Sequence, residues 1–101
     1  ENIGSDWWLP EANCARDLFD HEYYPNTIIK LHKIIEKNTA IEDCGRIHFY
    51  LGKSYEALAK TGQAIDAFQE TINRTKETDC QNAEAIKRVD EARKAIERLK
   101  L

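Results

Sequence analysis

Apolar residues recur every three or four positions along most of this 101-residue chain. The clearest stripe, formed by Ile28, Leu31 and Ile34, has the spacing of a helix that buries one face. Runs that alternate between β-branched and polar residues, which are typical of half-buried strands, do not occur in the sequence. The periodicity therefore predicts an all-α fold.

Five helices are predicted, joined by short turns so that neighbours are antiparallel. Pro10 suits the first turn of the first helix, and Thr39 with Glu42 has the spacing of a capping box before the third. Gly62 would mark the break after the third helix, and Asp79 would cap the fifth. The predicted ranges are about 10–21, 25–38, 41–60, 63–76 and 80–100.

Gly52 is unexpected inside the third predicted helix, because an interior glycine costs about 1 kcal/mol relative to alanine. The pattern around it consists of His48, Leu51, Gly52, Tyr55, Ala64 and Phe68. This spacing resembles the tetratricopeptide repeat, a two-helix unit of about 34 residues. The chain departs from the family at His48, where tryptophan is commonest, at Thr71, where alanine is usual, and at Lys76, where a proline closes the repeat. Gly52 would then face Ala64 and allow two helix backbones to meet.

A weaker copy of the same pattern precedes this one. On its later helix, Thr27, Leu31 and Ile34 correspond to Ala64, Phe68 and Thr71. On its earlier helix, Cys14, Ala15 and Leu18 correspond to Leu51, Gly52 and Tyr55. The resemblance implies a right-handed superhelical array of two repeats, closed by the last helix as a solvating cap. Such an array would form one domain over residues 10–101, with residues 1–9 packing on it or extending from it.

Trp7 and Trp8 stand together before the first helix, and each could bury about 150 to 250 Å². The preferred interpretation is a staple that packs on the first helical hairpin. The functional alternative is a docking epitope for a partner or for a second copy of the chain, because aromatic residues dominate interface hot spots.

The resemblance also implies a concave groove, lined by the first helix of each repeat, that receives a peptide or a partner's helix. Carried over to this sequence, the groove positions are Arg16, Phe19, Arg46, Phe49, Lys53 and Lys87. Four of these are cationic, which would suit an acidic segment or a terminal carboxylate. Ala12 and Tyr50 replace residues of the clamp that binds chaperone tails, so that ligand is not expected. The alternative is that these cationic residues are ordinary solvated charges. On the fifth predicted helix, Glu84 and Arg88 would likewise form a solvated i,i+4 pair.

Other functions have little support in the sequence. A net charge of -3 and a pI near 5.6 give no basic excess for binding nucleic acid. No apolar run approaches the roughly 20 residues that span a bilayer. His21, His32 and His48 are scattered, and no zinc-protease, hydrolase or phosphate-loop motif occurs. We therefore expect no catalytic residue, metal or cofactor.

Cys14, Cys44 and Cys80 cannot all pair within one chain, and none belongs to a CxxC unit. The preferred interpretation is three reduced thiols, with Cys14 partly in the core and inert there. If the chain is exported, one disulfide with one free thiol remains an alternative, and so does glycosylation at Asn73. Because the chain does not begin with methionine, we expect a processed or excised product, with the cytoplasm favoured and export or an organelle left open.

The sequence thus predicts a non-enzymatic protein–protein interaction module that binds a peptide or partner protein in its groove. The alternatives are a homo-oligomeric assembly module that uses Trp7 and Trp8, or an accessory domain of a larger protein. The first function needs an open cationic groove, whereas the second needs the tryptophans on the surface.

Overall fold

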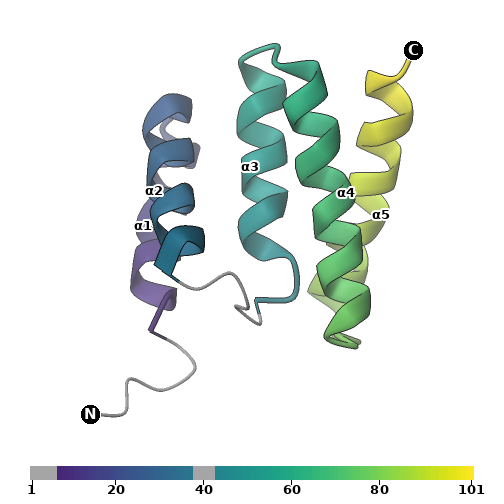
Figure 1. The fold of residues 1–101 in the computed structure, drawn as a ribbon, viewed down its shortest axis with the longest axis horizontal. Helices are drawn as coiled ribbons and strands as arrows, with labels where there is room; N and C mark the ends of the chain where they lie inside the picture. The colour runs from purple at the N-terminus through teal and green to yellow at the C-terminus, as the bar shows by residue number, and fades with distance from the viewer. Residues whose placement is uncertain (1–6, 38–42) are drawn as a thin grey trace.

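The computed structural model describes residues 7–37 and 43–101, and these residues form helices without any strand. The helices are α1 (Leu9–Asp20), α2 (Tyr24–Lys37), α3 (Arg46–Ala57), α4 (Thr61–Glu77) and α5 (Ala83–Leu99). In Figure 1, α1 and α2 overlap at one end of the long axis, and α3, α4 and α5 follow in chain order. The predicted all-α fold is confirmed, and the helix ends differ from the prediction mainly at both ends of α3 and at the start of α5.

The start of α3 is set by Asp43 and Gly45. The buried Asp43 carboxylate accepts hydrogen bonds from the backbone N–H groups of Gly45, at 3.1 Å, and Ile47, at 2.6 Å. Gly45 has a φ of +79°, and a Cβ atom there would lie 2.6 Å from the Thr75 hydroxyl oxygen. Only glycine fits both the left-handed backbone and the close approach of α4. The capping box expected at residues 39–42 lies outside the described residues.

The start of α5 corrects a prediction. Asn82 caps the helix, because its side-chain oxygen accepts a hydrogen bond from the backbone N–H of Ala85 at 2.8 Å. Asp79, the predicted cap, instead lies in the preceding turn with a φ of +54°. Gly62 likewise does not mark the break before α4, because it lies in that helix's first turn. The chain reverses at Ala59, which has a φ of +61°.

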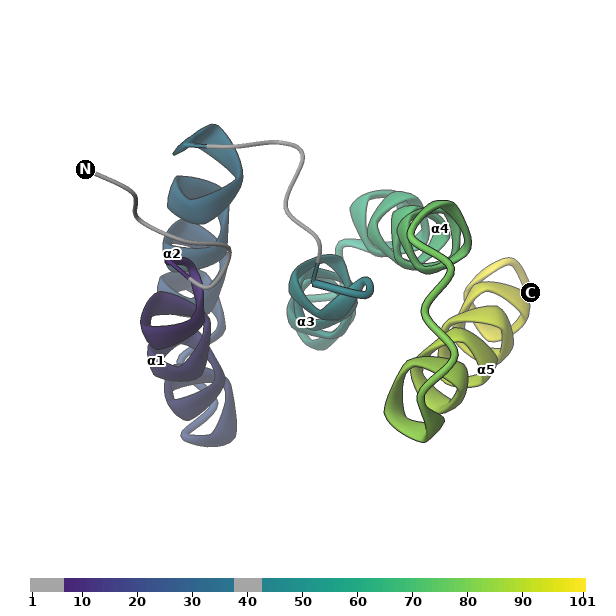
Figure 2. The same ribbon diagram turned by 90° about the horizontal axis from the view of Figure 1, so that it is seen from below.

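α3 is the central helix of the array. It packs against α2 and α4 and also touches α1 and α5, whereas no Cα atoms of α2 and α4 lie within 8 Å of each other. Seen from below, α3 lies between the α1–α2 pair and the α4–α5 pair (Figure 2). One group of buried apolar side chains, including Trp8 and Leu31, comes mainly from α1, α2 and α3. A second group, including Phe68 and Ala92, joins α3, α4 and α5.

The two copies of the sequence pattern bury equivalent positions on their later helices. These positions are Thr27, Leu31 and Ile34 on α2 and Ala64, Phe68 and Thr71 on α4, all at most 2% exposed. On the earlier helices, Ala15 and Gly52 are both buried. Cys14 is exposed, in contrast to its counterpart Leu51, so the prediction of a partly buried Cys14 is wrong.

Gly52 is a packing residue, as predicted, but Phe68 is the side chain that approaches it most closely. A Cβ atom on Gly52 would lie 2.8 Å from each of two ring carbons of Phe68. Ala64, the residue expected opposite the glycine, is buried in the same group of side chains as Phe68. The glycine therefore makes room for an aromatic ring between α3 and α4.

Cys44 and Cys80 form a disulfide, with their Cα atoms 5.8 Å apart. The interpretation of three reduced thiols is therefore wrong, and Cys14 is the free cysteine. The bond joins the segment before α3 to the turn before α5. The Cys44 carbonyl also accepts hydrogen bonds from Thr75 Oγ1, at 3.1 Å, and from Arg88 Nη2, at 3.3 Å. This one residue thus links the start of α3 to both α4 and α5.

Candidate functional site

A cavity of about 340 Å³ crosses α1, α3 and α5 on one face of the array. Its lining residues are Asn13, Arg16, Arg46, Phe49, Tyr50, Glu84, Lys87, Arg88 and Glu91. We call this cavity the groove. It forms because α3 touches both α1 and α5, which brings side chains from three separate helices around one space.

Aromatic rings in edge-to-face contact run beneath the groove. The ring centroids of Phe19 and Tyr50 are 5.2 Å apart, and those of Tyr50 and Phe49 are 5.7 Å apart. Phe49 continues the row to Phe68 at 6.1 Å and is itself only 5% exposed. Lys53 Nζ lies 5.6 Å from the Phe19 centroid and 5.3 Å from that of Phe49, which are cation–π distances. Of this row, Phe49 and Tyr50 line the groove and form its aromatic floor.

Cationic side chains dominate the rim of the groove. Arg46 donates a hydrogen bond from Nη2 to the side-chain oxygen of Asn13 at 2.7 Å. Burial, together with the nearby charges of Arg16 and Arg88, lowers the pKa of Arg46 below its ordinary value, and the guanidinium still remains charged. In the described parts of the chain, no carboxylate lies within 4.0 Å of Arg16, Arg46, Lys87 or Arg88. The acidic residues of the lining, Glu84 and Glu91, are fewer than these four cations.

Four of the predicted groove residues lie in the lining: Arg16, Arg46, Phe49 and Lys87. Phe19 lies beside Tyr50, and Lys53 lines a smaller adjoining cavity of about 200 Å³ between α3 and α5. The sequence did not reveal Arg88, because it was interpreted as the helical partner of Glu84. Arg88 instead donates to the Cys44 carbonyl, 44 positions away in the chain, and no local pattern encodes that contact.

No family model, curated protein or solved structure matches this chain. Among the described residues, no group of three or more histidine, cysteine or acidic side chains could hold a metal ion. The helices of the described chain also lack the length and apolar composition needed to cross a bilayer. The geometry of the groove therefore carries the functional argument.

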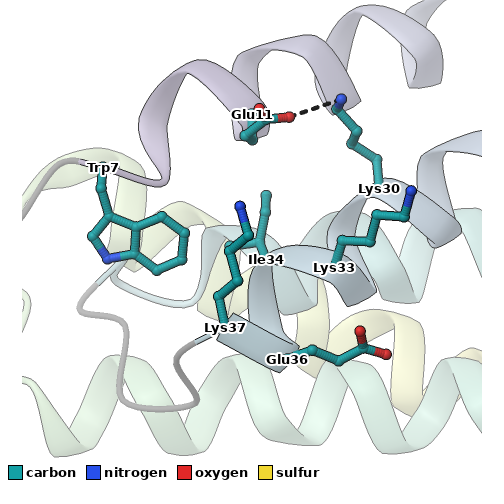
Figure 3. A pocket seen from close by; sticks show the side chains of 7 residues that line it. All are labelled: Trp7, Glu11, Lys30, Lys33, Ile34, Glu36 and Lys37. Atoms are coloured by element: carbon teal, nitrogen blue, oxygen red, sulfur yellow. Dashed lines mark ion pairs between the residues drawn. The ribbon is translucent and has the colours of Figure 1, made fainter.

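Neither Trp7 nor Trp8 lines the groove, and the two differ from each other. Trp8 is 8% exposed and belongs to the core. Trp7 is half-buried and lines a cavity of about 360 Å³ with side chains of α1 and α2. In Figure 3, Lys37 extends beside the Trp7 indole, with its Nζ 5.9 Å from the ring centroid. Only Trp7 could therefore contact a partner without unpacking the core.

Glu11 and Lys30 form an ion pair of 2.7 Å across the Trp7 cavity, marked by the dashed line in Figure 3. Hydrogen bonding to Lys30 lowers the pKa of Glu11, and the same bond raises the pKa of Lys30. Solvent reaches both side chains, so this pair contributes little to stability.

His48 should make the folded protein sensitive to acid. Burial lowers the pKa of its imidazole below the ordinary 6.5, and its Nδ1 atom is buried without a hydrogen-bond partner in the described structure. The unfolded chain therefore binds the proton more readily than the folded one. Stability should be fully present above pH 6.5 and should be lost as the pH falls through the folded-state pKa.

Urea unfolding of the wild type and of His48→Phe at pH 7.5 and pH 5.0 measures this contribution. The wild type should lose more stability on acidification than the variant, because the variant lacks the buried His48 imidazole. An equal loss in both proteins would exclude His48 as the cause.

Proposed function

We propose that this chain is a non-enzymatic binding module that holds an extended acidic segment of a partner protein in the groove. The observation that carries the proposal is the gathering of four cationic side chains, from three helices, around one cavity without a described carboxylate in ion-pair range. Such cations form charge-assisted hydrogen bonds with carboxylates, which are stronger than neutral ones. The aromatic floor would contact the apolar side chains of the same segment.

The tetratricopeptide resemblance supports this proposal. In that arrangement α1 and α3 would be the first helices of two repeats, and α5 would be the cap. These are the helices that line the groove. The Cys44–Cys80 disulfide favours an oxidising compartment over the cytoplasm, because thiols in the cytoplasm are kept reduced.

Charge reversal in and beside the groove tests the proposal. The probe is a fluorescein-labelled decapeptide in which glutamate alternates with leucine and tyrosine, and fluorescence anisotropy measures its binding. Arg46→Glu with Lys53→Glu should weaken binding by about tenfold or more, because two attractive charges become repulsive. The control is Lys60→Glu with Lys76→Glu, which makes the same change of net charge at exposed positions outside the groove.

Circular dichroism must give equal helicity for both double variants. The control should bind the peptide about as tightly as the wild type. If the groove variant also binds like the wild type, the peptide occupies another face and the proposed site is wrong.

Self-assembly is the competing function, and an accessory role within a larger protein is compatible with either. Assembly would have to use Trp7, since Trp8 lies in the core. Tyr23 and Ile29, both 58% exposed on the hairpin of α1 and α2, supply further apolar surface. Light scattering of the wild type beside Trp7→Ala separates the two functions, because a monomeric mass in both proteins would exclude assembly through this segment.

A further inference from the structure

Arg46 and Arg88 lie where two cavities meet at the disulfide end of the groove. Both residues line the groove and also a neighbouring cavity of about 390 Å³. Cys44, one half of the disulfide, lines that second cavity. The two guanidinium groups are therefore reachable from both spaces.

A main-chain carbonyl anchors Arg88, and most of its guanidinium N–H groups have no acceptor among the described residues. Its Nη2 donates to the Cys44 carbonyl at 3.3 Å, and Cys44 is in turn fixed by the disulfide and by Thr75. Its Nε atom is buried without a hydrogen-bond acceptor among the described residues. A guanidinium has five N–H donors, so Arg88 is ordered and yet mostly unpaired.

Arg46 donates to an exposed side chain, that of Asn13, and forms no ion pair with an acidic side chain of the described residues. The Asp43 carboxylate is occupied by the backbone N–H groups of Gly45 and Ile47. Glu84 lines both cavities but lies beyond 4.0 Å from either guanidinium. Two guanidinium groups that line the same two cavities, with no described carboxylate within 4.0 Å of either, favour the binding of an anion there.

We propose that Arg46 and Arg88 form a carboxylate-binding subsite, which fixes one acidic group of the bound segment at the disulfide end of the groove. This inference rests on the proposed function and deepens it, because it assigns one carboxylate of the bound segment to a particular pair of arginines. A planar carboxylate suits the forked donors of arginine, whereas lysine offers a point charge. The carboxylate comes from an acidic side chain or from the partner's C-terminus.

The test compares three forms of the labelled decapeptide by fluorescence anisotropy: one with a free C-terminus, one with an amidated C-terminus, and one with glutamine for glutamate. Arg88→Gln should weaken binding of the free acidic peptide by about tenfold or more. Arg88→Lys should recover only part of that loss. Arg93→Gln is the control, because Arg93 lies on the same helix and lines a different cavity, between α4 and α5. It should leave the affinity unchanged.

The peptide forms identify the source of the carboxylate. Loss of binding on amidation assigns the C-terminal group, and loss with the glutamine peptide assigns the side chains. If neither change weakens binding, the subsite does not recognise a carboxylate and the inference is overturned.

A ¹H–¹⁵N correlation NMR spectrum of the wild-type protein tests the contact between Arg88 and the peptide without a variant. The Arg88 Nε–H signal should shift when the acidic peptide is added. If Arg88→Gln binds the peptide normally while the charge reversal at Arg46 and Lys53 abolishes binding, the inferred subsite is wrong and the proposed function of the groove remains supported. If the wild type binds none of the peptides, the proposed function fails as well.

Discussion

Replacing Cys44 and Cys80 together by serine should lower the free energy of unfolding by about 3 to 4 kcal/mol. The disulfide joins residues 36 positions apart, and closing a loop of that length removes much of the conformational freedom of the unfolded chain. A domain of this size is stable by about 5 to 15 kcal/mol, so the loss is a large fraction of the total. Urea unfolding followed by circular dichroism measures it.

Cys14→Ser is the matched control, because Cys14 is exposed and unbonded. Its effect should stay within about 0.5 kcal/mol. Alkylation followed by mass spectrometry checks the pairing directly. The oxidised protein should take up one alkyl group, at Cys14, and the reduced protein should take up three. Three groups on the protein without reductant would contradict the disulfide.

Replacing Gly52 by alanine should destabilise the protein by about 1 to 3 kcal/mol, although alanine is the better helix former by about 1 kcal/mol. The added methyl group would lie 2.8 Å from the ring of Phe68, which is only 1% exposed and cannot turn away freely. Either α4 moves away from α3, or the ring leaves its preferred position. Leucine at the same position should cost more, because it adds further atoms to the same contact.

Gly62→Ala provides the control for Gly52→Ala. Gly62 lies in α4, and a Cβ atom there would meet nothing within 4 Å, so alanine should stabilise the protein by about 0.5 to 1 kcal/mol. Replacing glycine by alanine should thus lower the free energy of unfolding on α3 and raise it on α4. Adding Phe68→Ala should remove most of the penalty at Gly52 in a double-mutant cycle. A stabilising Gly52→Ala would show that the aromatic contact does not require the glycine.

The helices could be predicted because each one buries a stripe that is local in the sequence. The positions that the two repeat copies share on α2 and α4 are among the most completely buried in the described structure, including Thr27 and Thr71. Helix ends were harder to predict, because they depend on which polar side chain reaches the first free N–H groups. Asn82 does so at α5 and Asp43 at α3, whereas Asp79 lies in a left-handed turn.

Four of the nine residues that line the groove were predicted, and two of them, Arg46 and Phe49, keep a fixed register with Gly52 on α3. Arg46 lies six positions before that glycine and Lys53 one position after it, so the helical period brings them to neighbouring parts of one face. Arg88 and the disulfide could not be found in this way. Both require Cys44 to lie close to the end of α4 and the start of α5, and the spacing of the three cysteines does not encode that proximity.

The bond between Cys44 and Cys80 makes the α3–α4 hairpin a closed covalent ring. The turn at Ala59 and Lys60 lies within this ring and is exposed, so it is open to proteases. A protease that cut this turn would leave two fragments joined through sulfur, with Phe68 still packed against Gly52. The nicked molecule would keep its architecture as two chains, and they would separate only under reduction.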